Sequence, residues 1–297
     1  MEASAIHTPN LMTSEPLLAE ASRSIAVLGW MRRNLTLIIG GSLVLALILA
    51  AIVGPTLMPY DPTAGDIENS LASPSHAHLL GTDYEGRDML ARVLSGGRVA
   101  LGIGVTTVGV SLIIGSLLGM IAAYAGGIVG AVIMRVLDIV ISFPYVVLVI
   151  AVLAVVGPGM LSVGIAIAAV DWTAYGRIVY ALVLSVRERE YVEACKAIGV
   201  PHWRILMRHI VPNVSTSALV YATLDVTQVI LLMSSLSFLG LGAQPPSSDW
   251  GTMVADGRAY IYSAWWISTF PGLAIMLTGS CFAILGDGLA ETLDKRH

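Results

Sequence analysis

Charged residues are scarce in this chain. Asp, Glu, Lys and Arg make up 12% of its 297 residues, against roughly a quarter in soluble domains. Apolar residues make up 56%, and the mean hydropathy is +0.81. A soluble domain could not bury that much apolar surface, so the solvent must be lipid. The net charge of −4 is small and no basic tract is present, which excludes a nucleic-acid partner.

Cysteine and lysine are also rare. Cys195 falls in a polar stretch and Cys281 in an apolar one, so these thiols do not indicate a disulfide framework. Lys196 and Lys295 follow Cys195 and Asp294, so neither completes the Gly-Lys-Ser/Thr loop that cradles ATP phosphates. The sequence therefore predicts no ATPase site and no cofactor in this chain.

Metal and hydrolytic sites find no support either. His76 and His78 have no adjoining Cys and only distant acids, which favours a solvated loop over a metal site. Ser and His never pair on a Gly-x-Ser-x-Gly elbow, so nucleophilic hydrolysis is not indicated. Residues 1–22 are polar, without a basic run or an adjoining apolar core, which predicts a tail and not a cleaved signal.

Apolar windows long enough to cross about 30 Å of hydrocarbon recur along the rest of the chain. They fall at about residues 35–54, 99–124, 136–156, 160–184, 214–238 and 265–285. Lipid tolerates only structures whose backbone groups are satisfied internally, so each window predicts a transmembrane helix. The expected organisation is a cytoplasmic amino tail at 1–34 and a single all-α membrane domain at 35–297.

Basic residues set the orientation. With both termini in the cytoplasm, twelve of the sixteen Lys and Arg lie inside, as the positive-inside rule requires. Those inside are Arg23, Arg32, Arg33, Arg135, Arg177, Arg187, Arg189, Lys196, Arg204, Arg208, Lys295 and Arg296. Arg87, Arg92, Arg98 and Arg258 remain outside, on the long outer segments 55–98 and 239–264.

Several residues predict local features of the spans and outer loops. Pro144 predicts a kink in the third span. Gly115 and Gly119 have the small-xxx-small spacing that lets helices approach closely. The Trp265-Trp266 pair suits an aromatic anchor at the outer interface.

A charged segment of about two dozen residues separates the fourth and fifth spans. Between its charges, apolar residues keep a helical rhythm until Gly199 and Pro201 break it. Residues 187–212 therefore predict two short amphipathic helices at a sharp angle, with Pro212 ending the second. Such helices enter a groove on a partner or lie on lipid headgroups, and the mixed charges with a single Trp favour the partner.

The segment also resembles a known motif. Glu193-Ala194-Cys195, Gly199 and Val211-Pro212 are similar to the Glu-Ala-Ala…Gly…Leu-Pro coupling loop of the dipeptide/oligopeptide/nickel permease family of ABC importers. Cys195 and Val211 depart from the pattern, each replacing one compact apolar side chain by another. Four further stretches resemble the same family in the same order: Leu80–Asp88, Leu236–Gly251, Phe270–Ile275 and Gly286–Leu289. The match runs from about residue 30 to the end and indicates the second-permease ("C") type.

The resemblance implies a fold, a function and partners. The fold is an all-α membrane protein with six transmembrane helices, the type I ABC importer permease fold, in a bacterial inner membrane. The chain would form half of a translocation path for dipeptides or oligopeptides, beside a paralogous permease. Two ATPase subunits would bind ATP and Mg²⁺ and dock on Glu193, Ala194, Cys195, Ile198, Gly199, Trp203 and Pro212. An extracytoplasmic solute-binding protein would deliver the substrate.

The outer motif has its own expected role. Gly81, Asp83, Gly86, Arg87 and Asp88 belong to a segment, 66–98, that we expect to meet the binding protein or close the outer gate. Cysteines at positions 83 and 85 should then react from outside.

Two carboxylates fall inside the membrane. Asp171 lies near the middle of the fourth span and Asp225 near the middle of the fifth, where an exposed charge costs about 2.5–3.5 kcal/mol. Both should face protein or water. Asp225 shares a polar stripe with Tyr221 and Gln228, which favours a place on the translocation path. For Asp171 a buried helix–helix hydrogen bond is favoured, with a place on the path as the alternative. For Asp225 the buried hydrogen bond is the alternative.

Other functions are weaker candidates. The same importer class also carries glutathione, nickel chelates and opines. A channel or secondary transporter would favour broken helices in inverted repeats, and the two halves show no such symmetry. An intramembrane enzyme would need a catalytic constellation, which is not apparent.

Overall fold

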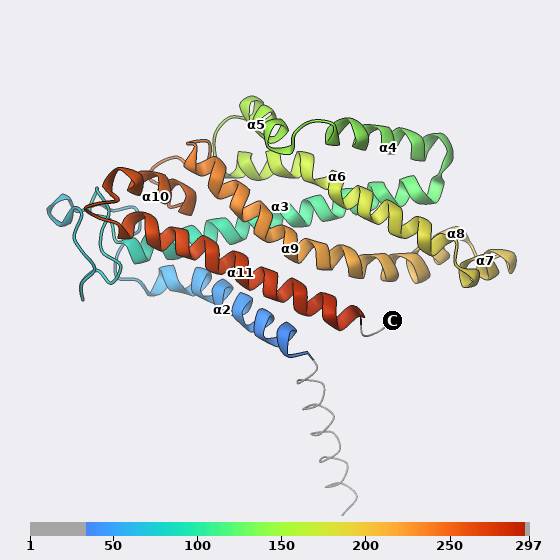
Figure 1. Ribbon diagram of the computed structural model, residues 1–297, viewed down its shortest axis with the longest axis horizontal. Helices are drawn as coiled ribbons and strands as arrows, with labels where there is room; N and C mark the ends of the chain where they lie inside the picture. The colour runs from blue at the N-terminus through green and yellow to red at the C-terminus, as the bar shows by residue number, and fades with distance from the viewer. Residues whose placement is uncertain (1–33, 295–297) are drawn as a thin grey trace, which may run out of the picture.

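Long apolar helices make up the body of the molecule. The computed structural model describes residues 34–294, and Figure 1 shows their helices running side by side along its long axis. In these residues, five segments are long and apolar enough to cross a membrane. They are α2 (Leu35–Leu57), α3 (Met89–Ala125), α6 (Met160–Arg187), Trp203–Phe238, which contains α9 (Val211–Phe238), and α11 (Trp266–Asp294). Residues 1–33 of the tail expected at 1–34, and residues 295–297, lie outside the described residues.

The third predicted span is two helices. α4 (Gly127–Ile141) and α5 (Tyr145–Val156) meet at an angle of 93°, so the kink expected at Pro144 is a sharp break. Proline removes a backbone donor and disfavours a helical conformation at Phe143 before it. At 1.5 Å per residue, neither helix alone reaches about 30 Å. Counting the bent pair as one span gives six, the number that the sequence predicted.

The second span begins ten residues before its predicted start. α3 starts at Met89 and not at 99, because Asp88 caps it by accepting a hydrogen bond from the Ala91 N–H at 2.8 Å. Arg92 and Arg98 made the start of this helix look too polar for a membrane span, but both have partners in the structure. Arg98 donates to the Ile52 carbonyl at the end of α2 at 2.6 Å, and Arg92 pairs with Asp83. Part of the expected outer segment 55–98 is therefore helix.

α3 and α6 pack at backbone distance. Gly115 faces the carbonyl of Trp172, and Gly119 faces the carbonyl of Gly176. A Cβ at either position would strike the α6 backbone, so the small-xxx-small prediction is confirmed. α11 lies between α2 and α9 on the other side of the bundle (Figure 1).

The loops at one end form a separate small core. α10 (Trp250–Gly257), the turn η4 (Arg258–Tyr260) and the starts of α3 and α11 meet there, whereas the turn η2 (Ile67–Asn69) lies outside this core. The indole N–H of Trp266 donates to the Thr82 carbonyl at 3.0 Å, and that of Trp250 donates to Val93 at 2.8 Å. Trp266 is 5% exposed and Trp265 50%, so only Trp265 is placed as an interfacial anchor. The expectation for Trp266 was wrong because its ring fills this core.

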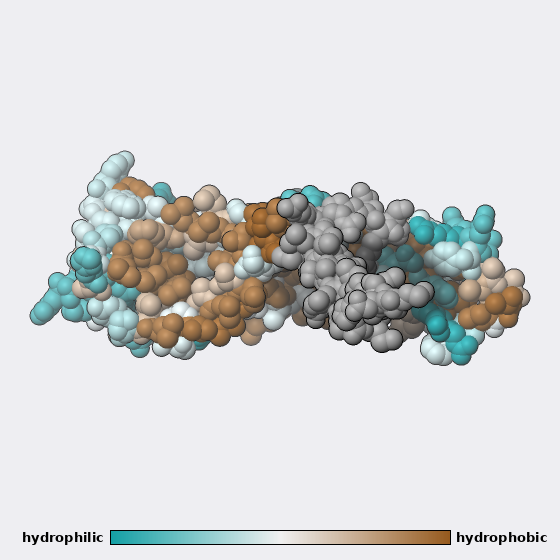
Figure 2. Space-filling model, turned by 90° about the horizontal axis from the view of Figure 1, so that it is seen from below, coloured by the Kyte–Doolittle hydropathy of each residue, from teal (hydrophilic) through white to brown (hydrophobic). Residues whose placement is uncertain are grey.

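The short helices α7 (Glu190–Ala197) and α8 (His202–Ile205) lie at the opposite end from α10 (Figure 1). Figure 2 shows hydrophobic side chains over most of the face between the hydrophilic left end and the grey residues, and mostly hydrophilic side chains with a small hydrophobic patch at the right end. This distribution suits a protein that crosses a bilayer along its long axis.

Candidate functional site

The turn after α7 is built around Gly199. Gly199 has a φ of +78°, its N–H donates to the Lys196 carbonyl at 3.0 Å, and the Val200 N–H donates to the Cys195 carbonyl at 3.0 Å. These two bonds make a Schellman motif, which needs a left-handed residue at the glycine position. Pro201 follows, and α8 begins at His202. The predicted break between two helices is confirmed here, and it falls at the glycine.

Residues 187–212, called the coupling segment after the motif that they resemble, pack against the ends of the long helices. Val192, Ile205 and Ile210 are each 0% exposed and pack against Val183 and Val186 at the end of α6. Arg187 donates to the Ala123 carbonyl at the end of α3 at 2.9 Å. These contacts join the short helices to α6 and α3.

The opposite face of the segment is bare. Ile198 is 79% exposed, Trp203 64% and Met207 62%, while Glu193 and Ala194 are also exposed. The Arg204 guanidinium lies 5.6 Å from the Trp203 ring centroid, a cation–π arrangement. We call Glu193, Ala194, Ile198, Trp203 and Met207 the coupling tip. Met207 was not predicted as part of this surface. Its position in the short helical stretch that leads into α9 could have indicated it.

Two predicted members of the site stand apart from the tip. Cys195 is half-buried on the anchoring side, where it packs with the core that contains Val192. Pro212 does not end a helix. The chain passes from α8 through the π-helical turn η3 (Leu206–Ile210) into α9 without a break, and Pro212 lies in the first turn of α9. A proline is tolerated there because the π-helical turn directly before it replaces the regular i→i−4 hydrogen bonds, one of which Pro212 cannot donate.

The membrane carboxylates lie together, away from the bundle surface. Asp171 is 5% and Asp225 6% exposed, and the two carboxyl groups are neighbours. The Tyr175 hydroxyl donates to Asp225 Oδ2 at 2.7 Å, and its ring meets that of Tyr221 edge-on at 5.1 Å. This is the helix–helix hydrogen bond that was the alternative for Asp225. The expectation that Asp225 faces the path is not met in this structure, because Asp225 lies about 60° around α9 from Gln228 and turns toward α6.

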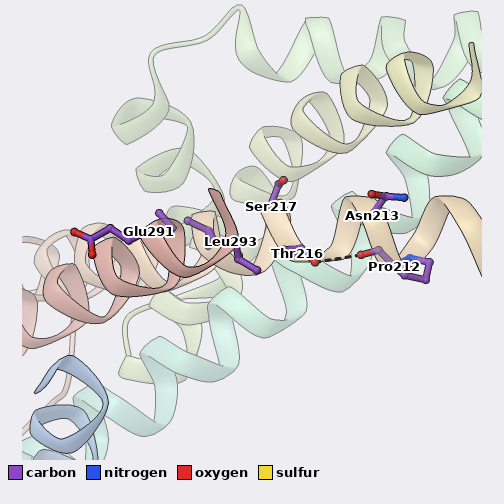
Figure 3. Close-up of a pocket in the computed structure, with 8 residues that line it drawn as sticks. Pro212, Asn213, Thr216, Ser217, Glu291 and Leu293 are labelled. Atoms are coloured by element: carbon purple, nitrogen blue, oxygen red, sulfur yellow. Dashed lines mark hydrogen bonds between the residues drawn. The ribbon is translucent and has the colours of Figure 1, made fainter. Parts of the chain in front are cut away.

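The rest of the predicted α9 stripe does reach the surface. Ser217, Gln228 and Ser235 are exposed, and Tyr221 is half-buried beside them. They lie within about 40° of one another around the helix. A hollow of about 590 Å³ opens between the first turns of α9 and the last turn of α11, at the same end as the coupling tip (Figure 3). Asn213, Thr216, Ser217 and Glu291 supply its polar side chains.

Most of the outer motif, Leu80–Asp88, is buried and not exposed to solvent. Thr82, Asp83, Arg87 and Asp88 are each 4% exposed or less, and only Glu85 is exposed among the charged side chains of the motif. Asp83 accepts from the backbone N–H groups of Glu85 and Arg87 and from Arg87 Nε at 2.7 Å, and it also pairs with Arg92. The expectation that position 83 is accessible from outside was wrong, because this carboxylate is the centre of a loop-closing network.

Charge and turn geometry hold that loop in place. Burial alone lowers the pKa of Arg87, but the hydrogen bond and charge of Asp83 outweigh it and leave the pKa above its usual value. Burial raises the pKa of Asp256 on α10, against the opposing charges of Arg92 and Arg87. Gly86 has a φ of +76° and leaves no room for a Cβ beside the Asp66 backbone. Arg92 was not predicted, although an Arg in the first turn of an apolar helix requires a partner.

Comparison with known proteins places the chain. Residues 115–297 match the family described as binding-protein-dependent transport system inner membrane component, and residues 30–74 match the N-terminal TM domain of oligopeptide transport permease C. The probable D,D-dipeptide transport system permease protein DdpC of Escherichia coli (strain K12) is 40% identical over 272 residues, 91% of each chain. The dipeptide transport system permease protein DppC of Alkalihalophilus pseudofirmus is 39% identical over 297 residues, 98% of each.

The solved structures agree on the fold. An inward-facing structure of the MetNI methionine ABC transporter superposes with a TM-score of 0.55 at 18% identity, over 67% of this chain and 94% of that one. The fold is thus that of a type I ABC importer permease. The chain belongs to the family of binding-protein-dependent transport system inner membrane components, with the amino-terminal domain of the oligopeptide permease C type. It is a permease subunit, and ATP is hydrolysed by partner subunits in this family.

Proposed function

We propose that this chain is the second permease of an importer for dipeptides or oligopeptides in a bacterial inner membrane. The observation that carries the proposal is the coupling tip, a solvent-exposed apolar and acidic surface on short helices that pack against α6 and α9. Relatives named as dipeptide, di/tripeptide and oligopeptide permeases, at 39–40% identity, support the peptide class. In this proposal the tip enters a groove on an ATPase subunit that binds ATP and Mg²⁺.

The exposed α9 stripe supports the translocation step. Ser217, Tyr221, Gln228 and Ser235 would face a paralogous permease across the path, and the hollow in Figure 3 would be its cytoplasmic mouth. Hydroxyl and amide groups can exchange hydrogen bonds with a peptide backbone without holding a charge strongly. Weak, exchangeable contacts suit a path that must release its cargo, and an extracytoplasmic binding protein would supply the selectivity.

Replacement of Glu193 by Arg should disconnect the permease from its motor. The change reverses the charge of an exposed side chain on the coupling tip, so we expect peptide uptake to fall at least about tenfold and ATPase co-purification to be lost. The assay is uptake of a labelled dipeptide by proteoliposomes that contain both permeases, both ATPases and the binding protein. Glu68→Arg, the same charge change on the exposed outer loop, is the matched control and should preserve ATPase association.

Normal transport by Glu193→Arg would contradict the docking assignment. A complex that is active with loaded binding protein but takes up glutathione in place of dipeptides would retain the importer class and overturn the peptide substrate.

Cysteine labelling should establish the orientation. In a Cys195→Ala, Cys281→Ala background, Glu85→Cys should react with a membrane-impermeant maleimide in intact cells, because its side chain is exposed at the outer end. Glu193→Cys should react only after permeabilisation. Met253→Cys, on α10 at the same end, should stay unreactive in both, since position 253 is 1% exposed. Labelling of position 193 alone in intact cells would reverse the proposed topology.

A further inference from the structure

Two acidic side chains lie next to each other in the interior of the membrane domain without a basic partner. Asp171 of α6 and Asp225 of α9 are 5% and 6% exposed. In the part of the chain that the structure describes, the ion pairs involve His78, Arg87, Arg92 and Arg177, and none of them reaches either carboxyl group. Two negative charges this close in a low-dielectric interior repel each other and lose their hydration. Something positive must be held between them.

The surroundings are oxygen-rich and incompletely satisfied. Ser111 of α3 is 0% exposed, and its hydroxyl lies beside Asp171 yet makes no hydrogen bond of normal geometry. Oδ2 of Asp171 is likewise buried without a partner. Buried polar atoms are rarely left unpaired, so these two oxygens point to an occupant of the site. The groups that face the pair from the packed helices are Ser111 (α3), Tyr145 (α5), Tyr175 (α6) and Tyr221 (α9).

The chemistry of the donors limits the occupant. Carboxylate and hydroxyl oxygens are hard ligands, which suit hard cations. A divalent ion such as Mg²⁺ dehydrates reluctantly and prefers to keep several waters, which a buried site between packed helices does not favour. A monovalent ion or a proton can take the same place with little or no water.

We propose that Asp171 and Asp225 form a site for one small monovalent cation, Na⁺ or a proton, drawn from the aqueous phase. The cation bridges the two carboxyl groups and so ties α6 to α9, the helices on which the coupling segment is anchored. The site stands independently of which substrate the importer carries.

The test uses the assembled transporter in detergent at pH 7.5. Its melting temperature is measured in NaCl and in choline chloride at equal ionic strength, and its infrared spectrum is recorded for the C=O stretch of a protonated carboxyl group. If Na⁺ is the occupant, saturating NaCl should raise the melting temperature by about 2–4 °C. If a proton is the occupant, the carboxyl band should be present in both salts and the melting temperatures should agree.

Variants assign the signal to the site. Asp171→Asn and Asp225→Asn should each remove the Na⁺ response or the carboxyl band. Asp138→Asn, which breaks an exposed pair with Arg177, should leave both intact. Ser111→Ala keeps both charges and should shift the Na⁺ midpoint to higher concentration or move the carboxyl band, which provides a readout if the Asn variants fail to assemble. The proposal is overturned if the wild type shows neither signal, or if Asp138→Asn abolishes the signal as the site variants do.

Discussion

Replacing Gly199 by Val is expected to reduce peptide uptake to background while the permease still inserts and assembles with its paralogue. Gly199 has a φ of +78°, a conformation that costs an L-residue more than about 1 kcal/mol and a β-branched residue more again. A Cβ at this position would meet nothing within 4 Å, so the effect would come from the backbone and not from a clash. Relief of the strain would unwind the turn and redirect Ile198 and Trp203, which lie on either side of it.

The matched control is Gly199→Asn. Asn is the other residue that commonly takes the left-handed position at a helix end, so this variant should keep most of the uptake. The measurements are dipeptide uptake in proteoliposomes and ATPase co-purification on the same samples. Equal loss in the Asn and Val variants would show that any side chain at 199 blocks docking, and normal uptake by Gly199→Val would refute a role for the turn.

Replacing Asp83 by Ala should unfold the outer end of the protein. The change leaves the guanidinium groups of Arg87 and Arg92 buried without their shared carboxylate, which costs about 3–5 kcal/mol when a buried pair is broken. The loss includes the turn that Asp83 closes by accepting two backbone N–H groups. We expect outside protease to cleave near residues 66–88 and transport to be lost, with a lower melting temperature of the assembled complex.

Glu85→Ala is the control for this second change. Glu85 also pairs with Arg87, at 2.9 Å, but its side chain is 48% exposed, and surface pairs contribute about 0–1 kcal/mol. Its removal should leave protease resistance and melting temperature nearly unchanged. If Asp83→Ala behaves like Glu85→Ala, the network is not what holds the outer loop.

The sequence alone predicted the features that depend on local pattern and on the solvent. Apolar length determined the spans, since lipid forces each apolar segment to close its own backbone hydrogen bonds. The break at Gly199 followed from a helical rhythm that stops at a residue tolerant of positive φ. The spacing of Gly115 and Gly119 predicted a close helix contact, because two small residues on one face of a helix let a neighbouring backbone approach closely.

Only the tertiary structure decided which side chains meet. Asp225 and Tyr175 are separated by 50 residues in sequence, and Trp266 and the carbonyl of Thr82 by 184, so no local pattern could pair them. The stripe on α9 was read correctly as polar, yet 60° of rotation decides that Asp225 turns inward while Gln228 stays exposed. The outer motif was recognised, but its carboxylate proved to be buried because arginines from a neighbouring turn and the start of α3 neutralise it. Local sequence determined which segments are helical and where they break, whereas the direction each charge faces depends on how distant helices pack, since burial of a charge is decided by its partners.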